Sequence, residues 1–118
     1  MYEKKLIDLL SPFVNGEVYP DHSIDNPTFP LIFYQQIGGQ DYVYVENKLP
    51  DHNHARVRIT VASNKRIDSN NLIRQIARTL IESNTFPAVE IISSFNTQSF
   101  PDLGIYEAIQ DFGIWYSN

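Results

Sequence analysis

The chain has 118 residues, a formal net charge of −5 and no cysteine. Its composition, 42% hydrophobic and 19% charged, predicts one globular domain over residues 1–118 and excludes disorder of the whole chain. The excess of acidic residues disfavours general nucleic-acid binding, because phosphate groups are repelled. The lack of cysteine excludes disulfides and thiolate metal sites, and no apolar stretch is long enough for a signal peptide or a membrane span. We therefore expect a soluble intracellular protein without membrane contact.

The first thirty residues predict one helix, one short strand and a loop. Residues 2–13 have apolar side chains at helical spacing, which predicts a short amphipathic helix. Residues 17–20, "EVYP", predict a brief strand. Prolines at both ends and within residues 20–30 predict a long irregular loop, and loops of that length are often functional.

The next stretch is rich in β-branched and aromatic residues. Residues 31–47 predict a β-hairpin with its turn at Gly38-Gly39-Gln40-Asp41, because glycine supplies the positive φ of a tight reversal. A polar loop is expected over residues 47–54, and the alternation over residues 55–63 predicts a strand. The core-facing side chains of this strand are expected to be Val57, Ile59 and Val61, and the outward-facing ones Arg56, Arg58 and Thr60.

A second helix is predicted over residues 72–81, where apolar side chains recur at positions i, i+1, i+4 and i+5. Asp68 and Ser69 are the expected N-cap candidates, because their side-chain oxygens accept bonds from free backbone N–H groups. The helix is expected to end near Asn84, before a proline.

The remaining residues predict two strands with a break between them. Residues 88–96 alternate as a strand does, and residues 96–104, with a proline and a glycine, are expected to break the pattern. Residues 105–118 predict a last strand with apolar side chains on both faces, as in a central or covered strand. Trp115 lies on the opposite face from Phe112, so its indole needs cover from another element or another molecule, which indicates an oligomer.

Helix, strands, helix and strands in that order predict an α+β fold. The expected architecture has two layers, a mostly antiparallel sheet with two helices packed on one face. This arrangement would bury the apolar stripes of both helices against the same side of the sheet.

No stretch of the sequence predicts catalysis. Asp111-Phe112-Gly113 matches the magnesium-binding triplet of protein kinases, but the phosphate loop and catalytic loop of a kinase are absent from the sequence. His52 and His54, beside Asp51, form a pair that is usually solvated, whereas a zinc site needs three or four convergent ligands. We expect no catalytic residue, no metal site and no bound cofactor.

Several residues are candidates for contact with a partner. Arg56 and Arg58 lie two apart on one strand and share a face that suits an acidic partner, although a solvated sheet face has the same pattern. The exposed aromatic and histidine positions nearby extend this set. The predicted interface residues are Arg56, Arg58, Trp115, Tyr42, Tyr44, His52 and His54.

The order of these segments resembles one known family. The run "PLIFYQ" after a proline-rich loop, a glycine-bearing turn, the strand "RVRITVAS", an amphipathic helix and the closing "QDFGIWY" resemble the small tail-completion proteins of long-tailed bacteriophages and prophages. These are also called tail terminator or head-tail joining proteins. The resemblance extends from about residue 2 to residue 116.

The resemblance implies a structural role. Such a protein assembles with copies of itself into a ring, expected to be a hexamer, which caps the tail tube and forms the joint to the head connector. It implies no catalysis and no cofactor. The tail tube protein and the connector protein would be the partners, the bacterial cytoplasm the place of assembly and the virion tail the final location.

Two other classes remain open from the residues alone. One is a soluble adaptor or regulatory domain that binds one protein partner through an exposed sheet face. The other is a small enzyme, for which the available residues are His22, His52, His54 and nearby aspartates.

Overall fold

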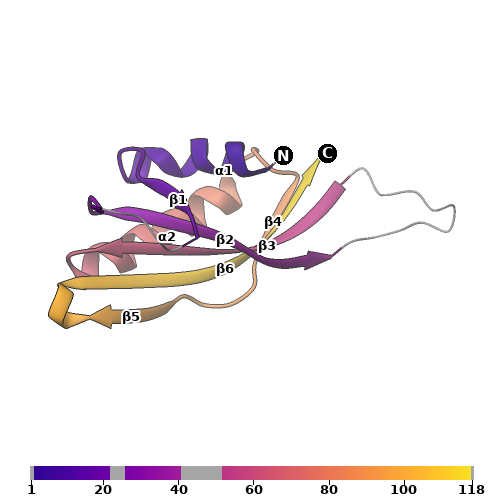
Figure 1. The fold of residues 1–118 in the computed structure, drawn as a ribbon. Helices are drawn as coiled ribbons and strands as arrows, with labels where there is room; N and C mark the ends of the chain where they lie inside the picture. The colour runs from indigo at the N-terminus through magenta and orange to yellow at the C-terminus, as the bar shows by residue number, and fades with distance from the viewer. Residues whose placement is uncertain (1, 22–25, 41–51, 118) are drawn as a thin grey trace, which may run out of the picture.

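A twisted sheet and two helices that cover one of its faces make up the fold (Figure 1). The computed structural model describes residues 2–21, 26–40 and 52–117. It confirms the predicted α+β class, with a mixed and mostly antiparallel sheet. The helical elements are α1 (Tyr2–Leu10), η1 (Ser11–Phe13), α2 (Arg66–Glu82) and η2 (Pro101–Leu103). The strands are β1 (Val18–Pro20), β2 (Leu31–Gln40), β3 (His52–Ser63), β4 (Ala88–Ile91), β5 (Asn96–Phe100) and β6 (Ile105–Ser117).

The strands follow the order β1-β2-β3-β6-β4, and β5 also pairs with β6. Among the pairings of the described strands, only that of β1 with β2 is parallel. One edge of β6 pairs with β3 along nearly its whole length, and its other edge pairs with β4 and then β5. The last strand is therefore central, as its two apolar faces predict.

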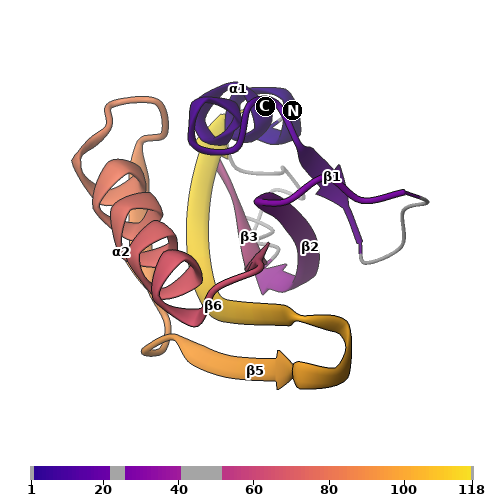
Figure 2. The same ribbon diagram turned by 90° about the vertical axis from the view of Figure 1, so that its left-hand side faces the viewer.

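The core lies between the sheet and the helices (Figure 2). The alternation in β3 is confirmed, because Val57, Ile59 and Val61 are fully buried on the side that α2 covers. Thr60 differs from the prediction: it is buried although it lies on the other face, where it pairs with Phe33 of β2. The helical side chains that fill the core are Leu6, Leu10, Ile73, Ile76 and Leu80.

The predicted turn at residues 38–41 is wrong. Gly38 and Gly39 lie inside β2, which continues to Gln40 and pairs with β3. Their positive φ values of 145° and 157° accompany an irregular register that begins after Gln36, so the glycines bend a continuous strand. The second half of the predicted hairpin, residues 41–47, lies outside the described residues.

Two boundaries near β3 and α2 also differ from the prediction. Residues 52–54, expected in a polar loop, belong to β3. The helix α2 begins at Arg66 with Lys65 as its N-cap, so neither Asp68 nor Ser69 caps it. Ser69 is instead buried, and its hydroxyl donates to the backbone oxygen of Tyr106 over 2.7 Å. Because a buried hydroxyl needs a hydrogen-bond partner, this bond lets a polar residue lie on the inner helix face.

The expected break over residues 96–104 is only partly correct. Residues 96–100 form β5, which pairs with the first residues of β6, and the break is confined to η2 and Gly104. Neither α1 nor α2, the α-helices of the described ranges, combines the length and the apolar character that crossing a membrane requires.

The side chain of Tyr2, at the start of α1, packs against that of Tyr116, near the end of β6. Its ring lies 5.0 Å from that of Tyr116, centroid to centroid, and its hydroxyl donates to Oε1 of Gln36 over 2.8 Å. Burial, with the nearby Glu3 carboxylate as a smaller cause, raises the pKa of Tyr2 to about 12. The neutral phenol is therefore the form that the fold favours.

This raised pKa predicts a loss of stability in alkali. Because the pKa is higher in the folded than in the unfolded chain, the contribution is present below pH 10 and is lost as the pH rises toward 12. For each protein, the unfolding free energy at about pH 11 is compared with its own value at neutral pH. The decrease is expected to be about 1.4 kcal/mol larger for the wild type than for Tyr2→Phe. Urea unfolding of both proteins measures this difference, and parallel pH profiles would contradict it.

Candidate functional site

Four of the predicted interface residues lie on the sheet face opposite the helices, here called the outer face. Residues that pair directly across two strands share a face. His54 pairs with Trp115, and Arg56 pairs with Gly113. Arg58 follows on the same face of β3. The outer face therefore brings these candidates together from β3 and β6, and it is the first candidate site.

His54 and Trp115 form the centre of a small cluster. Their rings lie 4.7 Å apart, and Nε2 of His54 lies 3.1 Å from Oε1 of Glu90 on β4. The His54 side chain is only 5% exposed, and its Nδ1 is buried without a hydrogen-bond partner. Trp115 is partly exposed, so its own chain covers part of the indole and leaves the rest at the surface.

Gly113 makes this cluster possible. A Cβ atom at that position would lie 2.5 Å from Oε1 of Glu90 and 2.7 Å from Nε2 of His54. The two side chains thus meet directly above the backbone of β6, and any other residue there would push them apart. Neither Glu90 nor Gly113 was predicted from the sequence, although Gly113 is the last residue of the Asp111-Phe112-Gly113 triplet.

Arg58 already has a partner in its own chain. Its guanidinium donates to both carboxylate oxygens of Asp111, from Nε over 2.9 Å and from Nη2 over 3.2 Å. This contact raises the pKa of Arg58 further, so the guanidinium stays charged. Arg56 is exposed on the same face and is the freer of the two to meet a partner.

The end of the outer face near β1 is apolar and covered. Leu31, Phe33 and Ala62 are buried there against Phe29 and Ile105. A small cavity of about 180 Å³ lies among these side chains. The run "LIFY" signalled this second cluster, because consecutive apolar residues in a strand must bury both of its faces.

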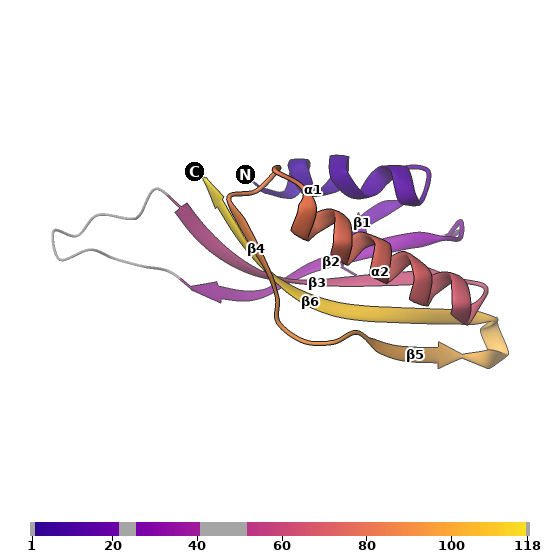
Figure 3. The ribbon, with the colours of Figure 1, turned by 180° about the vertical axis from the view of Figure 1, so that it is seen from behind.

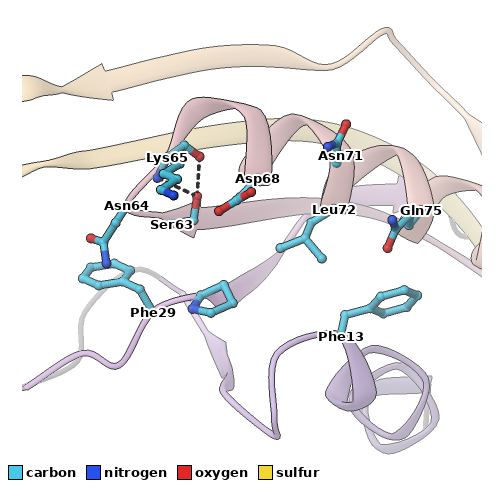
Figure 4. Close-up of a pocket in the computed structure, with 10 residues that line it drawn as sticks. Phe13, Phe29, Ser63, Asn64, Lys65, Asp68, Asn71, Leu72 and Gln75 are labelled. Atoms are coloured by element: carbon cyan, nitrogen blue, oxygen red, sulfur yellow. Dashed lines mark hydrogen bonds between the residues drawn. The ribbon is translucent and has the colours of Figure 1, made fainter.

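A larger groove lies between α2 and the elements that face it. It has a volume of about 550 Å³. The ring of Phe13 lies across it from Leu72 and Gln75, and the ring of Phe29 lies at its other end near Asn64 (Figure 4). Its rim also includes Lys65, whose backbone oxygen accepts a hydrogen bond from the hydroxyl of Ser63 over 2.7 Å. The walls of this groove combine aromatic rings with amide and charged side chains.

The other predicted residues lie at the start of β3 or before it in the chain. His52 is the first residue of β3 and pairs with Ser117, while Tyr42 and Tyr44 lie outside the described residues. In the described ranges, no three His, Asp or Glu side chains are grouped as a metal site requires. His22 and Asp51, named with the possible metal and enzyme sites, also lie outside those ranges.

Comparison with known proteins gives a likeness of fold. No protein-family model and no curated protein matches the sequence. Among solved structures, the chain is similar to a chain of the virion of a native gene transfer agent (GTA) particle, with a TM-score of 0.62 and 8% sequence identity. The similarity covers 98% of this chain and 91% of that chain. At this identity the likeness concerns the fold.

Proposed function

We propose that this chain is a non-enzymatic structural subunit of a phage or prophage virion. More specifically, we propose a tail completion protein that forms a ring, caps the tail tube and joins it to the head connector. The observation that carries this proposal is the likeness to a virion chain over nearly the full length of both chains. The sequence resemblance to tail-completion proteins points to the same class independently.

The outer face supports a role in assembly. It places partly exposed Trp115 and exposed Arg56 beside the His54–Glu90 pair. The backbones of β3 and β6, which carry Arg56, His54 and Trp115, are fixed by pairing on both edges. Aromatic and arginine side chains are enriched at protein interfaces, and a rigid sheet presents them at little cost in entropy. Tyr42, Tyr44 and His52 are proposed as further interface residues.

The proposed partners are further copies of the chain, expected to form a hexamer, together with the tail tube protein and the head connector protein. Assembly would take place in the cytoplasm of a bacterial host, and the ring would remain in the virion tail. Under this proposal the protein binds neither specific nucleic-acid sequences nor membranes.

Electron microscopy of the purified chain mixed with tail tubes from its own virion tests this function. We expect closed rings, and tubes that carry one ring at one end and stop growing when the chain is added. Tubes that bind no ring and polymerise at an unchanged rate would contradict the proposal. A chain that remains monomeric and binds one other protein would favour the adaptor class instead.

A further inference from the structure

The outward side of α2 carries an unusual stripe of residues. Ile67, Arg74, Arg78 and Ile81 follow one another at intervals of seven, four and three positions, so they lie on one face of the helix. The residues that α2 buries, among them Ile73 and Ile76, lie on the opposite side. In Figure 3 this helix lies in front of the sheet. We call these four residues the basic face.

The basic face is both apolar and charged. Ile67 is 65% exposed and Ile81 is 46% exposed, although isoleucine is usually buried. Arg74 and Arg78 are exposed, and in the described part of the chain no ion pair includes either of them. The guanidinium of Arg74 lies 5.5 Å from the ring centroid of Phe95, a contact that orients the arginine without neutralising it. Apolar side chains beside unpaired arginines are typical of an interface.

The charge of this helix is opposite to that of the remaining chain. Residues 65–82 contain four basic and two acidic residues, whereas the rest of the chain contains five basic and twelve acidic residues. A second copy therefore offers an acidic surface to the basic face. The separation of charge within one chain makes contact between copies favourable, even though both copies have a net charge of −5.

Acidic side chains lie on the other side of the molecule from α2. In Figure 2, α2 is on the left, and β1 and the turn after β5 are on the right, with the sheet between them. Glu17 and Asp21 flank β1, and Asp102 lies in that turn beside Leu103, which is 71% exposed. We call Glu17, Asp21, Asp102 and Leu103 the acidic side. Like the basic face, it combines charge with an exposed aliphatic side chain.

We propose that the basic face of one copy binds the acidic side of the next copy. Because the two surfaces differ and lie on opposite sides of the chain, the contact is head to tail, and repeated head-to-tail contacts close a ring when the rotation between copies permits. This inference rests on the proposed function, because it assigns the contact that would hold the ring together.

Charge exchange tests the contact. Arg74→Glu with Arg78→Glu is expected to weaken self-association on the order of tenfold or more, and Glu17→Lys with Asp102→Lys to do the same. A chain that carries all four substitutions is expected to recover most of the lost association, because the charges are again opposite. Sedimentation velocity at low salt over a range of concentrations measures each distribution, and circular dichroism verifies that α2 still forms.

Lys4→Glu with Lys5→Glu is the matched control, since it changes the net charge equally on exposed positions of α1. The contact is refuted if the arginine variant associates as this control does, if the fourfold variant shows no recovery, or if the wild type is monomeric at every concentration. Binding of another acidic protein to the basic face of a monomeric chain would also refute it.

These experiments distinguish a wrong contact from a wrong proposed function. If the arginine variant still forms rings that cap tail tubes, the function stands and this contact is wrong. If charge exchange controls assembly but the rings ignore tail tubes, the contact stands and the tail function is wrong.

Discussion

Replacing Phe112 with alanine is expected to lower the free energy of unfolding by about 3–5 kcal/mol. Phe112 is the largest fully buried side chain of the core, and β6 places it opposite Val57 of β3 and Ile91 of β4. Its removal leaves a cavity in the core beside β6. Because β3, β4 and β5 all pair with β6, the backbone of β6 cannot move inward to fill that cavity. Chemical denaturation monitored by the fluorescence of Trp115 measures the change.

Phe100→Ala is the matched control, because Phe100 is exposed at the end of β5. Its loss is expected to change stability by less than about 1 kcal/mol. Equal effects of the two substitutions would mean that the centre of the core lies elsewhere than β6.

The second large effect is expected at Gly39. A Cβ atom there would lie 2.2 Å from the backbone oxygen of His54, which a neighbouring strand holds in place. Gly39→Ala is therefore expected to cost about 1–3 kcal/mol more than Gly38→Ala. Gly38 has a similar positive φ, but a Cβ there meets nothing within 4 Å.

Comparing the two alanine variants separates the cost of a positive φ from the cost of the close contact between a Cβ atom and β3. Both variants carry the cost of a positive φ, so their difference measures the close approach of β2 and β3 alone. Thermal unfolding of the two variants, run side by side, is the measurement. Identical midpoints would show that the strands are farther apart at Gly39 than described.

The sequence predicted the fold class because periodicity is a local property. The alternation of Val57, Ile59 and Val61 and the helical spacing of Ile73, Ile76 and Leu80 each report burial directly, and two such signals fix a two-layer arrangement. Ile81, the last residue of the predicted stripe, is exposed instead. The turn at Gly38-Gly39 failed because glycine marks any backbone with positive φ, and a bent strand needs it as much as a turn does. β5 was missed because all five of its side chains are exposed, which leaves no burial pattern to read.

The candidate site was predicted less completely, because its contacts join distant residues. Arg58 was chosen from a predicted strand and His54 from a predicted loop, but the carboxylates they contact, Asp111 and Glu90, come from strands whose pairing the sequence does not reveal. Each residue of the triplet Asp111-Phe112-Gly113 has a structural role. The carboxylate of Asp111 binds Arg58, the ring of Phe112 is buried in the core, and Gly113 leaves space for the side chain of His54.

The central position of β6 sets an order for folding on the ribosome. β3, β4 and β5 all pair with this strand, so until residues 105–117 have left the exit tunnel they lack the partner that joins them. Most of the sheet must therefore form late in synthesis, and slow non-local pairing of this kind leaves strand edges open to nascent neighbours. A chain that stalls before residue 105 is therefore expected to be a target for chaperones.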